Sequence, residues 1–244
     1  DTERGATKRL YVDEPGTAPE EIGSGSLTSF NTDGFSLGDF SYENRNGQDH
    51  VAWTFRKAPG FFDIVTWTGD ASGAGSRTLS HSLGGTVGAI FVKCTSHSAD
   101  WMVWHKSLSG GYLNLNSPVT TQDPSNTYVS ATNSDFTITY DGSYFNYWNG
   151  SGRTYVAYIF AHDDAKFGTN GDESIIKCGI YTGNASNDGP EIDLGFEPQF
   201  LLYKNIDQAT NWEMIDTMRG MPNPGTTSSN YMKLLRPNTS DAEG

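Results

Sequence analysis

The sequence predicts an all-β protein made of two tandem, related β-sandwich-like units of short antiparallel strands, with little helix. Three observations lead to this prediction: short apolar runs alternate with polar residues, Gly-, Asn- and Asp-rich turns separate them, and one set of segments recurs along the chain. Side chains alternate between the two faces of a pleated strand, so short alternating runs favour strands over helices. Short strands separated by turn residues at intervals of about 8–12 residues are typical of sandwiches and barrels.

The composition favours the same fold class. The 244 residues include 28 Gly, and aromatic residues make up 13% of the chain. Each aromatic side chain buries a large area, so a core can form although the hydrophobic share is only 35%. Aromatic residues are enriched in strands, and glycine supplies the turns between them. We expect helix only as isolated turns, one near residues 18–22 and another near residues 213–219.

One set of sequence segments occurs twice in the same order. Residues 62–69 align with residues 176–183 at an offset of 114 positions. Three further pairs share an offset of 111 positions, namely 83–84 with 194–195, 90–93 with 201–204, and 100–103 with 211–214. Two segments upstream of these are also similar to later ones: 31–37 to 131–138, and 50–55 to 155–160. Recurrence in a constant order indicates a duplicated structural unit.

These matches divide the chain into four segments. We expect a polar N-terminal segment at residues 1–26, a first β unit at 27–116 and a second β unit at 117–220. Residues 221–244 would begin a further unit or form a tail. Residues 231–235 resemble 111–115, which favours a further unit. The polar start and the open end lead us to expect a fragment of a longer polypeptide.

Charge and hydropathy argue against two classes of partner. The chain has 16 Lys and Arg residues against 29 Asp and Glu residues, a formal net charge of −13. Nucleic-acid binding depends on clustered basic residues that neutralise phosphates, so we expect no nucleic-acid partner. No apolar run approaches the roughly 20 residues that a membrane-spanning helix needs, so we expect no membrane insertion.

Candidate catalytic and metal-binding groups are sparse. Cys94 and Cys178 both lie in apolar runs, where a lone cysteine behaves as a small buried hydrophobe. The acidic stretch at 162–173 departs from the spacing of a calcium-binding loop and is more typical of a solvated loop; whether it binds a cation stays open. Glu191 and Asp193 share one face of an expected strand, an arrangement more typical of a wetted surface than of a catalytic pair. We therefore predict no enzyme, no metal site and no cofactor.

Two clusters of aromatic residues are the best candidates for ligand binding. One cluster contains Trp101, Trp104, His105 and Tyr112, and the other contains Tyr144, Phe145, Tyr147 and Trp148 beside Asn149. The candidate site residues are Tyr147, Trp148, Asn149, Trp104 and His105. Aromatic faces combined with amide hydrogen-bonding groups are typical of small-ligand sites, including those for sugars. The alternative is that these rings fill the sandwich core, which is the interpretation we favour for Trp101 and its counterpart Trp212. For Tyr147 and Trp148, which precede an Asn-Gly turn, the two interpretations are balanced.

Several segments also resemble a known family. These segments are residues 60–69, 80–84, 155–163, 175–179 and 216–220. They resemble repeat domains in tail-fibre and other virion proteins of bacteriophages, notably marine phages that infect cyanobacteria. The resemblance covers roughly residues 27–240 as several blocks in the expected order, none of which is a catalytic signature. It implies a virion-associated β-rich module without a cofactor, and it carries over no functional residue.

The resemblance and the aromatic turns together define our functional expectation. We expect a phage virion structural protein, a tail-fibre or receptor-binding module that contacts a glycan or protein of the host cell surface. Its partners would be other virion proteins and further copies of itself, as in a trimer that covers exposed strand edges, on the exterior of the virion. One alternative is an architectural spacer or a capsid or tail decoration protein without a ligand. An enzyme that degrades surface polysaccharide has less support.

Overall fold

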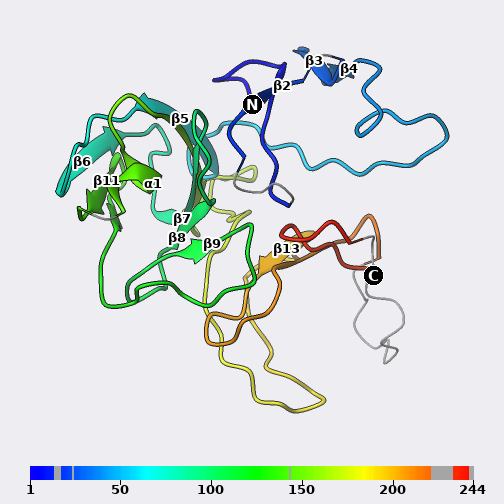
Figure 1. Ribbon diagram of the computed structural model, residues 1–244. Helices are drawn as coiled ribbons and strands as arrows, with labels where there is room; N and C mark the ends of the chain where they lie inside the picture. Colours follow the sequence, from blue (N-terminus) through cyan, green and yellow to red (C-terminus); the bar gives the residue numbers. More distant parts are fainter. Residues whose placement is uncertain (14–17, 24, 143, 221–232, 242–244) are drawn as a thin grey trace.

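The computed structural model describes residues 1–13, 18–23, 25–142, 144–220 and 233–241. Within these residues the chain is almost entirely β, which confirms the predicted fold class. A sandwich of two antiparallel sheets forms one body, and the flanking parts of the chain carry short two-stranded sheets (Figure 1).

The sandwich is formed by the strands between residues 62 and 161. Its larger sheet has the strand order β5-β12-β7-β8-β9, and its smaller sheet has the order β10-β11-β6. Neighbouring strands are antiparallel in both sheets. The strands are β5 (Phe62–Thr68), β6 (Gly75–Ser80), β7 (Val87–Cys94), β8 (Met102–His105), β9 (Leu113–Asn114), β10 (Val129–Ala131), β11 (Asp135–Tyr140) and β12 (Thr154–Ala161).

The last strand of the sandwich, β12, returns to the middle of the larger sheet. It pairs with β5 along one edge and with β7 along the other. Tyr155, Ala157 and Ile159 belong to the core between the sheets, whereas Val156 is buried in a cluster on the opposite face. Burial on both faces explains why β12 is a nearly continuous apolar run rather than an alternating one.

The main core lies between the two sheets and is rich in aromatic rings. Trp67 of β5 stacks on Tyr155 of β12, with ring centroids 5.2 Å apart. Phe136 of the smaller sheet meets Trp67 edge-on at 6.2 Å, so this contact joins the two layers. Cys94 is fully buried in the same core, which confirms that it behaves as a small hydrophobe.

A short helix, α1 (Phe145–Trp148), covers one end of this core and is followed by a tight approach of two backbones. At Gly69, just after β5, a Cβ atom would lie 2.2 Å from the carbonyl oxygen of Gly150. Only glycine fits at Gly69 unless the backbone after α1 moves. This close approach sets where the chain enters β12.

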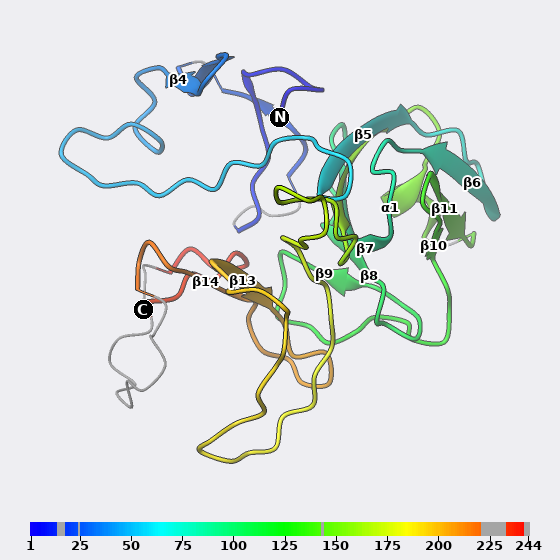
Figure 2. The same ribbon diagram turned by 180° about the vertical axis from the view of Figure 1, so that it is seen from behind.

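The flanking parts of the chain form three two-stranded sheets. They pair β1 (Lys8–Arg9) with β2 (Glu21–Ile22), β3 (Leu27–Phe30) with β4 (Phe35–Leu37), and β13 (Phe200–Tyr203) with β14 (Glu213–Asp216). Figures 1 and 2 show the β3–β4 hairpin and the segment after it extending away from the sandwich, while β13 and β14 lie beside β9.

The structure does not confirm two tandem sandwiches with a boundary between residues 116 and 117. Strands from both predicted units combine in each sheet, because β12 lies between β5 and β7, and β11 pairs with β6. The repeated segment at 176–183 forms no strand, although it lies within the described residues. The predicted segment 221–244 lies largely outside them, since residues 221–232 and 242–244 are not described.

Both expected helical turns are wrong. Residues 21–22 form β2, and Glu213–Asp216 form β14. The strand at 213–216 follows from pairing with β13, a tertiary contact that overrides the local helical tendency of the sequence.

Candidate functional site

Trp148, the central residue of the predicted ligand site, belongs to the protein core. Its side chain is fully buried, stacks on Tyr128 with ring centroids 6.1 Å apart and meets Tyr112 edge-on at 5.9 Å. A ring enclosed in this way offers no face to a ligand. The structure therefore corrects the ligand-binding interpretation of Trp148 in favour of the core interpretation.

Asn149 is also fully buried, and hydrogen bonds fix its side-chain amide. Its Nδ2 donates to Asp70 Oδ1 at 2.7 Å and to the Tyr140 hydroxyl at 3.1 Å. Its Oδ1 accepts a hydrogen bond from Arg77 Nη1 at 3.1 Å. Both ends of the amide are therefore engaged within the protein. Asn149 ties the turn after α1 to the smaller sheet and is not available to a ligand.

Trp104 and Tyr147 are partly buried. Both pack against the edge of the main core, so only part of each ring reaches solvent. The Tyr147 ring lies 6.2 Å from that of Tyr144, the next aromatic residue toward the surface. Tyr147 therefore remains close to an exposed aromatic surface, whereas Trp104 on β8 lies opposite Ile90 of β7 and packs against the core.

His105 at the end of β8 is held in its neutral form. Burial, together with the charges of Lys106 and His162, lowers the pKa of His105 to about 4. Its Nδ1 accepts a hydrogen bond from the backbone N–H of Ser107 at 3.2 Å. A neutral imidazole that accepts from its own turn stabilises that turn, and the predicted ligand role of His105 gains no support from this geometry.

A hollow opens on the surface where β6 begins and β11 ends. It has a volume of about 510 Å³. Phenol, hydroxyl, amide and carboxylate groups line it, from Ser76, Asn126, Thr127, Tyr128, Tyr140 and Asp141. The two strands bring these groups together because Tyr140 pairs with Gly75, whose missing side chain leaves room for the tyrosine ring. This hollow combines the groups that the sequence led us to seek around Trp148.

One carboxylate organises the loop on one side of the hollow. Asp123 accepts hydrogen bonds from the Asn126 side chain at 2.7 Å and from the Tyr128 hydroxyl. These hydrogen bonds lower the pKa of Asp123, while burial and the bond to Asp123 raise the pKa of Tyr128. Asp123 itself adopts the left-handed conformation, with φ of 47°, which aspartate tolerates better than most residues. The loop is thus ordered before any ligand binds, which reduces the entropy lost on binding.

Tyr144 is the aromatic side chain that this region presents to solvent. It is 36% exposed, and its ring meets that of Tyr128 edge-on with centroids 6.3 Å apart. Its backbone N–H donates to Asp141 Oδ1 at 2.8 Å, so the carboxylate in the hollow also positions the start of α1. Tyr144 belongs to the aromatic cluster visible in the sequence, but Tyr128 and Tyr140 come from other segments, and no local pattern links them to it.

The acidic stretch at 162–173 serves as a structural loop. Asp163 forms an ion pair with Lys177 at 3.5 Å, and Asp164 accepts a hydrogen bond from the backbone N–H of Thr86 at 2.9 Å. Over the described ranges of the chain, no group of three or more His, Cys, Asp or Glu side chains is placed to hold a metal ion.

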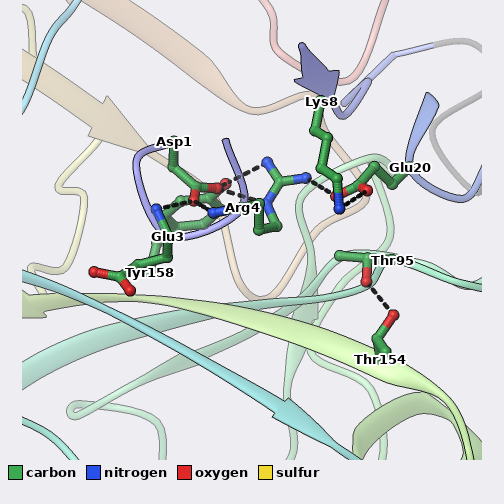
Figure 3. Close-up of polar contacts among 8 residues, drawn as sticks. All are labelled: Asp1, Glu3, Arg4, Lys8, Glu20, Thr95, Thr154 and Tyr158. Atoms are coloured by element: carbon green, nitrogen blue, oxygen red, sulfur yellow. Dashed lines mark hydrogen bonds and ion pairs between the residues drawn. The ribbon is translucent and has the colours of Figure 1, made fainter. Parts of the chain in front are cut away.

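A largely buried ion-pair network ties the N-terminal residues to the outer face of β12 (Figure 3). The Arg4 guanidinium lies between two carboxylates, 2.6 Å from Asp1 and 2.5 Å from Glu20. The Tyr158 hydroxyl on β12 donates to Asp1 at 2.6 Å. Lys8 also pairs with Glu20 at 3.1 Å, so two cationic side chains match the two carboxylates. The network therefore anchors one segment to another and presents no uncompensated charge to a ligand.

Among the described residues, no helix has the length and apolar character needed to cross a membrane.

Comparison with known proteins assigns the chain to a family without a known activity. A model described as a domain of unknown function, DUF7483, matches residues 1–244, so the chain belongs to that family. No curated protein and no solved structure matches the chain.

Proposed function

We propose that the chain is a structural part of a phage virion, of the tail-fibre or receptor-binding type, and that it contacts a host-surface glycan through the hollow beside Tyr144. The observation that carries the glycan contact is the composition of this hollow. Its lining is a preordered set of hydroxyl, amide and carboxylate groups, and the exposed Tyr144 ring, which is not part of the lining, contacts the Tyr128 ring that is. A small number of convergent polar groups beside an apolar surface is typical of small-ligand sites.

The chemistry of a sugar matches these groups. The apolar C–H face of a pyranose ring would lie on the exposed Tyr144 ring. Its hydroxyls would donate to the Asp141 carboxylate and exchange hydrogen bonds with the Asn126 amide, both of which line the hollow. Neutral sugars suit this site better than acidic ones, because the chain carries a net charge of −13.

The virion assignment is supported by the resemblance to phage tail-fibre repeats. The segments that carry the resemblance include residues 60–69 and 155–163, which contain β5 and β12, two adjacent strands of the larger sheet. What is similar is therefore the scaffold, while the hollow lies at strand ends and in a loop. A shallow hollow binds one sugar weakly, so attachment would depend on several copies of the protein acting together on the exterior of one virion.

A second candidate function is an architectural spacer without a ligand. The observation that favours it is the burial of the two tyrosines in the hollow, since Tyr128 and Tyr140 are 3% and 7% exposed. Only Tyr144 then offers a substantial ring face.

Binding assays with Tyr144→Ala separate these functions. The protein would be applied to host cells and to an array of host-surface glycans. We expect Tyr144→Ala to weaken binding by at least about tenfold, equivalent to about 1.4 kcal/mol. The matched control is Tyr42→Ala, which removes a tyrosine that is 75% exposed on the N-terminal part of the chain, and it should bind like wild type.

Each other outcome favours a different function. Unchanged binding of Tyr144→Ala would rule out the hollow as the glycan site. A wild-type protein that binds no host cell and no glycan would favour the spacer. Release of reducing sugar from host polysaccharide would instead identify a degrading enzyme.

A further inference from the structure

The part of the chain after the sandwich repeats the strand pairing inside it. We name residues 1–57 the N-terminal unit, 58–162 the central unit and 163–241 the C-terminal unit. In the central unit β7 pairs with β8 so that Ile90 lies opposite Trp104. In the C-terminal unit β13 pairs with β14 so that Leu201 lies opposite Ile215, both 111 positions later. Every other residue pair of β13 and β14 likewise corresponds to a pair of β7 and β8 shifted by 111 positions.

A hydrogen-bond motif next to these strands recurs as well. The Trp101 backbone N–H donates to Asn116 Oδ1 at 2.8 Å, and Asn116 Nδ2 donates to Asp100 Oδ1 at 2.8 Å. The C-terminal unit has the same two bonds at 2.8 and 2.9 Å, formed by Trp212, Asn238 and Asn211. The C-terminal unit is therefore a structural counterpart of the first half of the sandwich.

The part of the chain before the sandwich has the strand pairing of the second half of the sandwich. The β3–β4 hairpin has the register of the β10–β11 hairpin at an offset of 101 positions, apart from a bulge between Leu27 and Ser29. The pair of Arg9 in β1 and Glu21 in β2 corresponds to an isolated bridge between Tyr112 and Gln122 in the central unit. The structure thus contains parts of three related units.

Counterpart tryptophans connect successive units. The Trp101 indole Nε1 donates to the backbone carbonyl of Tyr11 in the N-terminal unit at 2.7 Å. The Trp212 indole donates to the backbone carbonyl of Asn114 in the central unit at 2.8 Å. Tyr11 and Asn114 are themselves counterparts, because each follows a leucine, Leu10 or Leu113, that packs into the same apolar cluster. The C-terminal unit therefore contacts the central unit as the central unit contacts the N-terminal unit.

A backbone hydrogen bond repeats the same relation. The N–H of Glu20 donates to the carbonyl of Thr95 at 2.7 Å, which joins the N-terminal unit to the central unit. The N–H of Thr121 donates to the carbonyl of Ile206 at 3.2 Å, which joins the central unit to the C-terminal unit. Thr95 and Ile206 are 111 positions apart, the offset of the two tryptophans.

An Asp-Thr-x-Arg-Gly motif occurs in both flanking units. It stands at residues 1–5 and again at 216–220. In each case the arginine Nε pairs with the aspartate of the motif, at 2.6 Å for Arg4 and 2.8 Å for Arg219. The backbone N–H of each arginine also donates to that aspartate at 3.0 Å. The motif thus presents a guanidinium in the same fixed way twice.

Each motif contacts the same aromatic position of another unit. Arg4 Nη2 donates to the hydroxyl of Tyr158 in the central unit at 3.2 Å. The Arg219 guanidinium lies over the ring of Trp53 in the N-terminal unit, 5.3 Å from its centroid. Tyr158 and Trp53 are counterparts in the repeated segments 155–160 and 50–55. The contact of Arg219 with Trp53 joins the C-terminal unit to the N-terminal unit, and neither tryptophan contact joins these two units.

These contacts close a cycle of three. The tryptophan contacts place the central unit after the N-terminal unit and the C-terminal unit after the central unit. The contact of Arg219 with Trp53 places the N-terminal unit after the C-terminal unit, in the same sense in which the contact of Arg4 with Tyr158 places the central unit after the N-terminal unit. A head-to-tail interface that returns to its start generates a ring. We infer that the three units form a ring around a pseudo-threefold axis within one chain, and that the partner which fits each unit's interface is another copy of the unit.

An apolar cluster at the junction draws on all three units, as a ring requires. It contains Leu10 and Val12 of the N-terminal unit, Trp101, Val103, Leu113 and Leu115 of the central unit, and Leu202, Ile206 and Trp212 of the C-terminal unit. The closing contact has an apolar part too, because the Phe55 and Phe200 rings lie 6.3 Å apart.

Cross-linking across the closing contact tests the ring. Phe55→Cys and Phe200→Cys would be introduced together in a Cys178→Ser background, where Cys94 remains buried. A short bismaleimide should link positions 55 and 200 within one chain in native buffer and not in urea. Light scattering should give the mass of one chain. Cross-links only between chains, or no cross-link in native buffer, would overturn the single-chain ring.

A double-mutant cycle gives a second test that does not depend on the cysteine variants. The urea midpoints of Trp53→Leu, Arg219→Met and their combination would be compared. The two substitutions should be non-additive, because they remove one shared contact. The matched control combines Trp53→Leu with Arg4→Met, which lies in the equivalent motif but contacts Tyr158, and it should be additive. Additivity in both cycles would contradict the closing contact.

Discussion

The central and C-terminal units carry the same strand-forming segments, yet the central unit alone has a closed core among the described parts of the chain. Ile90 of β7 is 0% exposed, whereas its counterpart Leu201 of β13 is 39% exposed. Trp67 is buried, and its counterpart Tyr181 is exposed. The registers of the two hairpins agree, so the difference does not lie in these strands. It lies in β12, which covers both β5 and β7 of the central unit.

This difference separates what short-range sequence specifies from what a distant strand supplies. Hairpins such as β13–β14 need only the turn and the two strands that flank it. A sandwich core also needs a strand that returns from far along the chain, with the loop-closure entropy that this involves. Of the large apolar side chains that are exposed within the described residues, Tyr144 alone lies in the central unit.

Truncation of a core tryptophan should show the largest contrast between units. Trp148→Ala removes a fully buried ring and is expected to lower the free energy of unfolding by about 3–5 kcal/mol. Trp53→Ala removes a partly exposed ring in the N-terminal unit and should cost about 1–2 kcal/mol. Urea unfolding monitored by circular dichroism would measure both. Equal losses would contradict the proposed difference in packing.

The counterpart pair Ile90 and Leu201 sharpens the comparison at a single strand position. Ile90→Ala is expected to cost about 2–4 kcal/mol, because it leaves a cavity in a closed core. Leu201→Ala should cost less than about 1 kcal/mol, because the side chain is already partly in water. The same urea experiment compares them, and a larger loss for Leu201→Ala would indicate that β13 is covered in solution.

Two counterpart glycines test the backbone approach after β5. At Gly69 an added Cβ atom would meet the Gly150 carbonyl oxygen, so Gly69→Ala should cost about 1–3 kcal/mol through forced backbone shifts. Its counterpart Gly183 has no atom within 4 Å of that position, so Gly183→Ala should change stability by less than about 0.5 kcal/mol. Thermal melting of the two variants checks this, and a destabilised Gly183→Ala would show unexpected packing there.

A further test is the pH dependence that His105 contributes to the stability of the central unit. Its pKa is lowered to about 4 in the folded protein, from 6.5 in the unfolded chain. The unfolded chain binds the proton more readily, so this contribution to stability is complete above pH 6.5 and is lost as the pH falls toward 4. His105→Gln should therefore lose less stability than wild type between pH 7 and pH 5. An unchanged pH profile would show that His105 is solvated.

Sequence patterns predicted those parts of the fold that depend on local chemistry. The all-β class followed from short strands and turn residues. Trp101 and Trp212 were expected in the sandwich core; both are buried, at 5% and 4% exposed, but in the separate apolar cluster at the junction of the units. Each lies just before a strand, and its indole donates to a backbone carbonyl of another unit, so the repeat predicted that these rings are buried but not where. The predicted boundary between residues 116 and 117 is not confirmed, because the offsets between segments do not reveal that β12 inserts between β5 and β7.

The candidate site was predicted only in part. Tyr144 and Tyr147 lie in the predicted aromatic cluster, but α1 turns Trp148 inward, and a single helical turn between an Asp-Gly and an Asn-Gly sequence leaves little periodic signal. Tyr128 and Tyr140 reach the hollow from separate segments that the β10–β11 hairpin brings together. Only the tertiary structure shows that these residues share a surface.

Hydrogen exchange of two counterpart segments tests the central claim most directly. Residues 62–68 form β5 and pair with β12, whereas residues 176–182 have the related sequence and form no strand. Exchange in native buffer should be slow in the peptide covering 62–68, opening only with global unfolding, and fast in the peptide covering 176–182. Equal protection of the two segments would contradict the account, because it would mean that the C-terminal unit also holds a closed core.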